Sequence, residues 1–248
     1  MRTAFTALMA LGLGFALAAP ASAYETKKGL EGGTIAGVVK FEGAAPAPKQ
    51  IEVKKNKEVC GKKPIYDESL AVGKGGGIRW AVARLLNVES GKAWDLKKAV
   101  IDQNGCFFTP HVAITRMKKS VRVLNNDGLL HNFHSFPKKN KAVNKAQPKF
   151  LKKMTLKGKF FRKPEIINVK CDVHAWMSGY IVVAENPYYA VTGADGKFKL
   201  ENVPAGKYKL EIWQEKLGRV VHAVTVKAKE TTNVSVSMNK KTAAVTIR

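Results

Sequence analysis

The sequence predicts an all-β chain that folds into two β-sandwiches of unequal size. Runs rich in branched and aromatic residues recur along its 248 residues, separated by turns that contain Gly, Pro, Asn or Asp. This pattern is typical of short strands. No long helical period of apolar residues occurs after the first 23 residues. The chain is longer than one small sandwich requires, so we expect a central domain and a second, smaller one.

Residues 1–23 have the features of a secretory signal peptide. Met1-Arg2-Thr3 precedes an apolar run from Ala4 to about Ala19, and Ala21-Ser22-Ala23 has the pattern of a cleavage site. The run is short for a membrane span, no Cys follows the cleavage site to take a lipid, and no later segment stays apolar for ~18 residues. We expect a soluble periplasmic or secreted protein that starts near Tyr24.

Residues 24–75 are predicted to form an N-terminal β extension. The stretch from Gly33 to Phe41 reads as a strand followed by an Ala-Pro loop. Its strand either extends the central domain or pairs with the C-terminal one, in which case residues from about 30 to 55 would join residues 188–240. Gly73 to Gly77 lacks the residues that complete a phosphate-binding loop and is expected to be a flexible turn.

Residues 76–185 are assigned to the central domain, with strand candidates at Arg79 to Val88, Val112 to Met117 and Ser120 to Leu124. Near its end, the segment Cys171 to Met177 contains a thiol, an imidazole and a thioether at three-residue intervals. This spacing could mark one face of a helix. Strand-like runs on both sides, at 166–169 and 179–183, favour a short loop between two strands instead.

Together with His131, the donors Cys171, His174 and Met177 form the ligand set that holds a single copper ion in electron-transfer proteins. Zinc is the obvious competitor, but structural zinc sites use four Cys or His ligands and zinc rarely accepts Met. His131 and His134 lie on opposite faces of an extended strand, so only one of them can face the metal. We prefer His131, which Asn132 follows; the remaining histidines, His111 and His222, are given no chemistry.

These residues resemble the type 1 copper proteins, or cupredoxins, and especially the amicyanin subgroup with its short C-x-x-H-x-x-M loop. The resemblance covers roughly residues 110 to 185 and implies a Greek-key β-sandwich with one type 1 copper. It implies that His131, Cys171 and His174 are the trigonal ligands, that Met177 is a weak axial ligand and that Asn132 tethers the ligand loops by hydrogen bonds. It also implies that His174 lies at the surface within an apolar collar, for which Leu129, Leu130 and Trp176 are candidates.

The other two cysteines, Cys60 and Cys106, are expected to form a disulfide, because an exported chain meets an oxidising environment and Cys171 is reserved for copper. Closing a loop of this length would stabilise the fold by roughly 4 kcal/mol on the chain-entropy model. Two free thiols or a second metal site are the alternatives, and no nearby His or carboxylate cluster favours the latter.

Residues 186–248 are predicted to form the smaller sandwich. Apolar residues alternate from Lys197 to Trp213, with turns at Asp195-Gly196 and at Pro204-Ala205-Gly206. The stretch from Ala194 to Tyr208 resembles the carboxypeptidase regulatory-like, transthyretin-like β-sandwich, and the strand from Gly33 resembles the opening of that domain. The resemblance implies a packing or binding role without catalysis, and it allows a domain that is discontinuous in sequence.

The net charge is +24, which is extreme for a small redox protein. Without residues 1–23 the chain keeps 42 basic and 19 acidic residues, a net charge of +23, and the stretch from Lys138 to Lys163 contains 11 Lys or Arg and no acid. This basic segment is either a solvated face or a surface that steers an acidic partner, such as a c-type cytochrome or a dehydrogenase. An anionic membrane surface or polysaccharide is a second candidate partner. Nucleic acid is not expected as a partner in the cell, because the chain is expected to be exported.

We therefore expect an exported electron carrier. The chain lacks the additional His-rich copper centre of a copper reductase or oxidase and shows no hydrolytic motif, so we expect no enzymatic activity. The alternatives are a copper-binding protein for storage or delivery, and a structural or adhesive β-protein with an incidental metal site. The former class favours exposed Met- and His-rich clusters, and the six Met residues here are dispersed.

Overall fold

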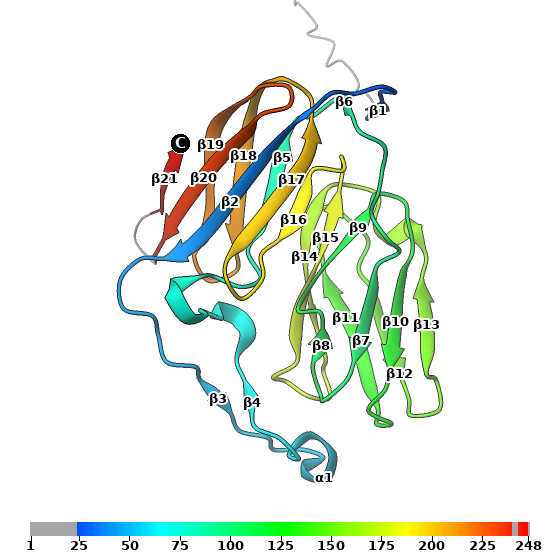
Figure 1. Cartoon of the computed structure of the whole chain (residues 1–248). Coiled ribbons are helices and arrows are strands. Elements are labelled where there is room, and N and C mark those ends of the chain that lie inside the picture. Colours follow the sequence, from blue (N-terminus) through cyan, green and yellow to red (C-terminus); the bar gives the residue numbers. More distant parts are fainter. Residues whose placement is uncertain (1–23, 240–242, 248) are drawn as a thin grey trace, which may run out of the picture.

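The computed structural model describes residues 24–239 and 243–247, and these residues form two β-sandwiches and an extended arm, as Figure 1 shows. The predicted all-β class is confirmed: the α-helix of the described residues is the single turn α1, Lys57–Cys60. No helix among these residues is long and apolar enough to cross a membrane. The expected signal peptide, residues 1–23, lies outside the described residues.

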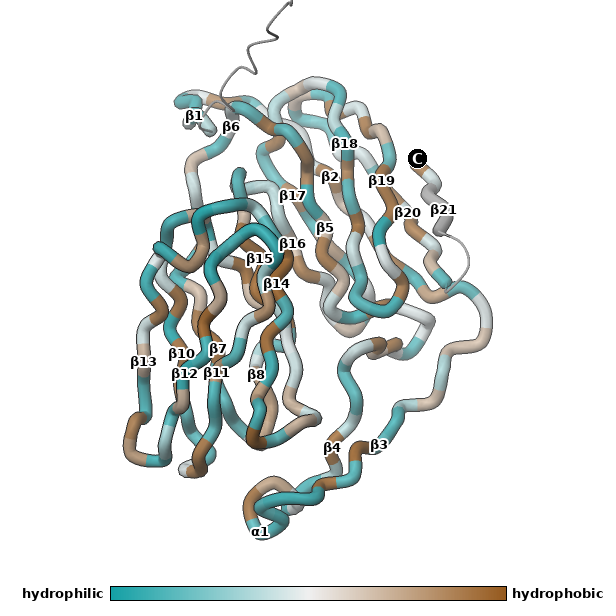
Figure 2. Tube along the Cα trace, turned by 180° about the vertical axis from the view of Figure 1, so that it is seen from behind, coloured by the Kyte–Doolittle hydropathy of each residue, from teal (hydrophilic) through white to brown (hydrophobic). Residues whose placement is uncertain are grey.

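The first sandwich contains a four-stranded sheet in the order β13-β10-β7-β8 and a five-stranded sheet in the order β12-β11-β14-β15-β9. Its core lies between the sheets and includes Phe108, Phe133 and Phe161. Figure 2 shows how hydrophobic and hydrophilic residues alternate along these strands. The strand bounds are β7 Val100–Gln103, β8 Phe108–Thr109, β9 Val112–Arg116, β10 Val121–Asn125, β11 His131–Phe136, β12 Asn144–Gln147, β13 Lys153–Leu156, β14 Glu165–Lys170 and β15 Ser178–Ala184.

The second sandwich is discontinuous in sequence, which is one of the two arrangements expected for the N-terminal region. Its sheets have the orders β16-β5-β18-β19 and β17-β2-β20-β21, so two strands from before the first sandwich join those that follow it. Strand β2 lies between β17 and β20 and is parallel to β20. The bounds are β2 Gly33–Phe41, β5 Val82–Leu86, β16 Tyr189–Val191, β17 Lys197–Val203, β18 Gly206–Gln214, β19 Gly218–Val226, β20 Thr231–Met238 and β21 Ala243–Ile247.

Strand β5 corrects the domain boundary drawn at residue 76. The strand at Arg79 to Val88 is expected in the central domain, but β5, which lies within it, is hydrogen-bonded to β16 and β18 of the second sandwich. Ala83 and Leu85 are buried in the core of the second sandwich, while Val82 packs in the cluster between the two sandwiches. A strand that is buried on both faces lacks a solvent-exposed side that would indicate its orientation. Its sequence therefore predicts a strand but does not identify the strands that it pairs with.

The two sandwiches meet through an apolar cluster in which Val82 and Tyr189 pack with Val112, Val182 and Ala184. A side-chain hydrogen bond crosses the same junction, with His111 Nε2 2.5 Å from Glu215 Oε1. Close packing of this kind holds the two sandwiches against each other.

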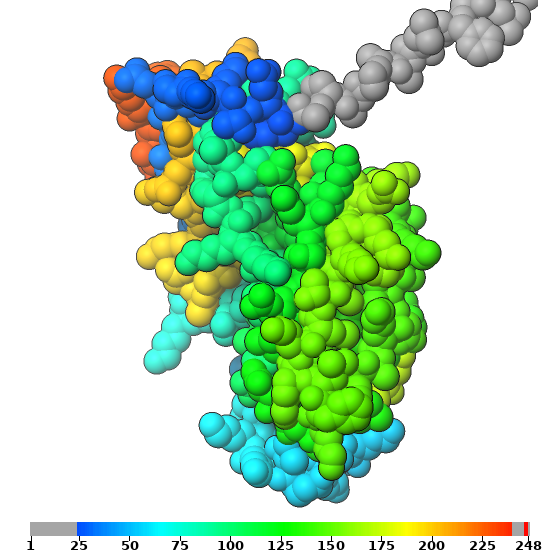
Figure 3. All heavy atoms as spheres, turned by 90° about the vertical axis from the view of Figure 1, so that its right-hand side faces the viewer, coloured from blue at the N-terminus to red at the C-terminus, as the bar shows by residue number. Residues whose placement is uncertain are grey.

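The arm is the segment from Gln50 to Tyr66, which contains β3 (Gln50–Ile51), α1 and β4 (Ile65–Tyr66). It leaves the second sandwich after β2 and crosses one end of the first sandwich, where Figure 3 shows it as a layer of atoms covering that end. Ile65 and Cys60 are buried in the core of the first sandwich. Cys60 forms a disulfide with Cys106, so the arm is covalently joined to the domain that it covers.

The remaining elements are short connections. A two-stranded pairing of β1 with β6 lies near the start of the described chain. The bounds are β1 Glu25–Thr26, β6 Ser90–Gly91 and three 3₁₀ turns, Glu68–Leu70, Lys74–Gly76 and Gly158–Phe160.

Replacing Glu211 on β18 should destabilise the chain, because Glu211 and Arg84 of β5 form a buried ion pair. Their N–O distance is 2.6 Å, and their side chains are 3% and 12% exposed. E211A leaves the Arg84 guanidinium without its partner and should lower the free energy of unfolding by about 3–5 kcal/mol, measured by urea denaturation. E201A, which removes the exposed partner of Lys199, is the control and should leave this free energy almost unchanged. Equal stabilities of the two variants would contradict the prediction.

Candidate metal centre

Two adjacent antiparallel strands bring the predicted donors together. Strand β11 begins at His131 and strand β14 ends at Lys170, immediately before Cys171. The register pairs His134 with Lys170, so residues before His134 and after Lys170 meet at the same end of the sheet. His131 and Cys171 are 40 positions apart in sequence but lie at the same end of the first sandwich.

The structure brings His131, Cys171 and His174 into one cluster of buried donor atoms. Cys171 Sγ lies 3.8 Å from His131 Nδ1 and 3.8 Å from His174 Nδ1, and the two Nδ1 atoms are 3.0 Å apart. The two histidines are 0% exposed and Cys171 is 2% exposed. A triangle with these sides accommodates one ion close to its plane at about 2.0 Å from each nitrogen and about 2.3 Å from the sulfur, which are normal lengths for imidazole and thiolate bonds to a metal.

Hydrogen bonds on the outer side of each ring direct its Nδ1 atom towards this cluster. His131 Nε2 lies 2.9 Å from Asp127 Oδ2, and His174 Nε2 lies 3.0 Å from Asn56 Oδ1. Both partners are acceptors, so each Nε2 carries a proton and each Nδ1 faces the cluster. Two ring nitrogens and a sulfur at these distances need a positive charge between them, which a proton on His131 Nδ1 supplies without a metal and which a metal ion would supply when bound. The donor set therefore fits a metal ion.

The ionisation of the cluster also suits a metal. Burial opposes the charged form of His131, but its hydrogen bonds with Asp127 and Cys171 outweigh burial and raise its pKa to about 9. For Cys171, burial favours the neutral thiol, yet the hydrogen bonds from His131 and from backbone N–H groups lower its pKa. Burial and the nearby charge of His131 lower the pKa of His174 to about 4. Cys171 therefore tends towards thiolate, the form that binds metal, and His174 is neutral, whereas a metal ion that binds His131 Nδ1 would displace the proton held there.

The loop from Asp172 to Met177 is closed by its own backbone. Met177 N donates to His174 O at 2.9 Å, and Cys171 N donates to Met177 O at 3.2 Å. Met177 is 0% exposed and belongs to the core of the first sandwich. The chain is thus folded tightly around Cys171 and His174, and the predicted axial role of Met177 stays a prediction.

Asn132 joins the two ligand segments. Its Oδ1 accepts from Asp172 N at 2.5 Å, and its Nδ2 donates to Asp172 Oδ2 at 2.8 Å and to Asn144 Oδ1 at 2.9 Å. Its backbone N–H donates to Cys171 Sγ at 3.5 Å. These contacts are the tether expected for this residue. His134 contacts the exposed carboxylate of Asp172 and lies outside the donor cluster.

The expectation that His174 lies at the surface is wrong. Its side chain is 0% exposed because the arm covers it and Asn56 occupies its Nε2 atom. Trp176 packs against it, with ring centroids 5.2 Å apart, and donates to Cys106 O. Leu130 is 48% exposed, whereas Leu129 packs against the core of the first sandwich. Of the three collar candidates, Trp176 is the one in ring contact with His174.

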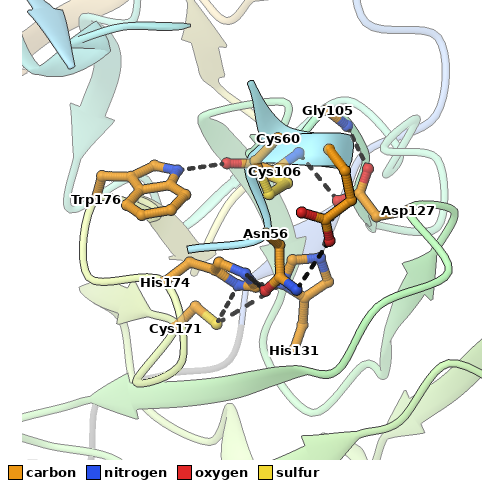
Figure 4. The surroundings of a disulfide bond; sticks show 10 residues. Asn56, Cys60, Gly105, Cys106, Asp127, His131, Cys171, His174 and Trp176 are labelled. Atoms are coloured by element: carbon orange, nitrogen blue, oxygen red, sulfur yellow. Dashed lines mark hydrogen bonds and ion pairs between the residues drawn. A yellow bond between two sulfur atoms is a disulfide. The ribbon is translucent and has the colours of Figure 1, made fainter. Parts of the chain in front are cut away.

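The disulfide connects the outer partners of both histidines, as Figure 4 shows. Asn56 caps α1, whose residue Cys60 donates its backbone N–H to Asn56 O. Across the disulfide, Cys106 N donates to Asp127 Oδ2, the atom that contacts His131. A single covalent bond therefore fixes the two groups that orient the two imidazoles.

Sequence reasoning missed Asn56 and Asp127. The carboxylate of Asp127 is four residues before His131 in an Asn-Asn-Asp-Gly turn, and this proximity could have identified it. Asn56 is 118 residues from His174, and no local pattern marks it.

The basic segment from Lys138 to Lys163 does not form a ring around the donors. Part of it follows the end of β11 and part precedes the start of β14. Because His131 starts β11 and Cys171 follows β14, these parts lie at the opposite end of the first sandwich. The turn between β12 and β13, residues 148–152, is the part that returns towards the donor end.

Residues 174–239 match the sequence model of the carboxypeptidase regulatory-like domain. This confirms the resemblance noted for the stretch from Ala194 to Tyr208. The matched range begins within the ligand loop and contains β15 to β20, whereas the second sandwich also takes in β2 and β5. No curated protein matches the chain in sequence.

Several solved structures are similar to part of the chain. A Cu(I) form of an amicyanin variant is 19% identical over 41% of this chain and 98% of its own, with a TM-score of 0.31. The purple cupredoxin from Nitrosopumilus maritimus is 18% identical over 35% of this chain and 100% of its own, with a TM-score of 0.29. The copper-containing nitrite reductase from Thermus scotoductus SA-01 is 19% identical, with a TM-score of 0.32, over 38% of this chain and 24% of its own length.

Replacing Asn132 should loosen the centre. N132A leaves the backbone N–H of Asp172 without its acceptor, which should lower the free energy of unfolding by about 1–3 kcal/mol and speed the loss of bound copper. The measurements are thermal unfolding and transfer of Cu(II) to EDTA. N233A, at an exposed position on β20, is the control. If N132A loses copper no faster than N233A, Asn132 does not tether the ligand segments.

Releasing the arm should expose His174. C60A/C106A removes the covalent anchor, and N56G removes the contact with His174 while Gly keeps the left-handed backbone of residue 56, where φ is 51°. We expect bicinchoninic acid to extract Cu(I) about tenfold faster from the double variant, which corresponds to ~1.4 kcal/mol less protection. N56G should be intermediate. If the double variant does not fold, the extraction rate of N56G alone tests the prediction. Extraction from the variants at the wild-type rate would show that the arm does not protect the centre.

Proposed function

We propose that the chain is an exported type 1 copper protein that passes single electrons between redox partners. The convergence of His131 Nδ1, His174 Nδ1 and Cys171 Sγ within 3.0–3.8 Å of one another carries this proposal. One thiolate and two imidazoles are the ligand set of copper electron-transfer sites, and an apolar surrounding with hydrogen bonds to the sulfur is their usual environment. Copper, when bound, supplies a one-electron couple.

The residues of the chain hold this ligand set in place. Asp127 and Asn56 fix the tautomers of the two histidines, Asn132 fixes the ligand segments relative to each other, and the tight loop keeps His174 close to Cys171. Donors held in this way need little movement when the metal changes its charge, and small movement favours rapid electron transfer.

Burial favours a carrier over a storage or delivery protein. All three donors are at most 2% exposed and the arm covers His174, so ion exchange would require the arm to open. A delivery protein needs accessible ligands. The disulfide between Cys60 and Cys106 supports export together with the N-terminal leader pattern. We propose a role as a carrier without enzymatic activity, in which the second sandwich positions the copper domain.

An optical titration with Cu(II) tests the proposal. The wild-type protein should develop one intense visible band from charge transfer between the thiolate and copper at one equivalent. C171S should lose the band and H131A should weaken it strongly, because each removes a donor. H134A is the matched control and should keep it, since His134 contacts Asp172 outside the cluster. A colourless or weakly absorbing wild-type complex would contradict the proposal.

A further inference from the structure

A partner that approaches the outer edge of His174 meets the arm first. Asn56 of the arm contacts His174 Nε2 directly at 3.0 Å, so this edge connects the donors to the side of the molecule that the arm covers. The surroundings of Asn56 therefore decide what kind of surface a redox partner encounters there.

The exposed side of the arm is basic. Five lysines and two glutamates lie between Gln50 and Tyr66, a net charge of +3. All five lysines are exposed, and they surround Asn56 in sequence: Lys54, Lys55, Lys57, Lys62 and Lys63. Lys54 pairs with Glu52 at 3.4 Å, but both side chains are more than 70% exposed, so this pair leaves much of the positive potential in place.

The arm presents these lysines in a fixed position. It is held by the disulfide to Cys106, by the pairing of β3 with β4, and by the packing of Ile51, Val53 and Ile65 on the core of the first sandwich. A groove runs between the arm and the ligand loop, with Glu52, Lys54 and Lys55 on one side and Asp172, Val173, Ala175 and Trp176 on the other. The groove itself is balanced in charge, and most of the net positive charge of the arm comes from outside it, where Lys57, Lys62 and Lys63 lie. Trp176 is also the residue that packs against His174. The lysines thus border a surface that reaches the ligand loop.

We propose that the arm is the docking surface for an acidic redox protein, and that the lysines of the basic segment at the opposite end of the first sandwich are not. This inference rests on the proposed function and names the partner and the surface of the same site. In the encounter one electron leaves Cu(I) held by the donors His131, Cys171 and His174 and is taken up by an oxidised acidic haem protein. Copper becomes Cu(II), the partner is reduced, and no bond or proton is transferred.

Two variants with the same change in net charge test the location. The arm variant is K54Q/K55Q/K57Q/K62Q/K63Q. The control variant, K138Q/K139Q/K141Q/K157Q/K163Q, removes five exposed lysines at the end of the first sandwich that is opposite to the donors. Both are compared with the wild type at low and high salt.

Binding and electron exchange are measured separately. Binding of a strongly acidic c-type cytochrome is followed by calorimetry with both proteins reduced, so that no electron moves. The oxidation of the Cu(I) protein by hexacyanoferrate(III) and by the oxidised cytochrome is followed by stopped flow. At low salt we expect the arm variant to bind the cytochrome at least about tenfold more weakly than the wild type, and to react with both oxidants at least about tenfold more slowly. The affinity and the rates of the control variant should change by less than about twofold.

Equal effects of the two variants would show that net charge alone governs the encounter. This result would contradict the inference that the arm is the docking surface, but it would not contradict the proposed electron transfer. A larger effect of the control variant would place docking at the basic segment and would also overturn the inference. If the wild-type Cu(I) protein exchanges electrons with neither oxidant, the proposed function itself fails, whatever the variants bind.

Discussion

The antiparallel pairing of β11 with β14 is the constraint on which the metal centre depends. Burial of Phe133, Ile167 and Val169 holds these strands in the core of the first sandwich, and their register carries His131 and Cys171 to the same end of the sheet. The apolar core fixes two imidazole nitrogens and a sulfur within 3.0–3.8 Å of one another, an arrangement that needs a proton or a metal ion between them. Asn132 completes the pairing by accepting from the backbone of Asp172.

The arm adds a second level of control to this centre. One disulfide lies between the residues that contact the outer nitrogens of both histidines, through Asn56 and α1 on one side and through Asp127 on the other. The arm belongs in sequence to the connection between β2 and β5 of the second sandwich, so the discontinuous topology delivers the cover of the metal centre. The second sandwich and the metal centre are in this way parts of one structural unit, although the former contributes no donor.

The sequence was sufficient for the donors because their information is local. Cys171 and His174 are three residues apart, His131 is followed by Asn132, and strand-like flanks exclude a helix. The sequence was not sufficient to predict that the arm covers His174, since Asn56 is 118 residues away from it. The sequence around Asn56 does not differ from that around an ordinary solvent-facing polar residue. The position of β5 was missed for a related reason: burial on both faces predicts a strand but does not identify the neighbouring strands.

The most direct test of the metal centre is X-ray absorption at the copper edge of the protein loaded with one equivalent of copper, in both oxidation states. We expect one sulfur at about 2.3 Å or slightly less and two imidazole nitrogens at about 2.0 Å, with little change between the two states. A first shell without sulfur, or with oxygen and nitrogen donors only, would contradict the assignment of Cys171, His131 and His174 as one copper site.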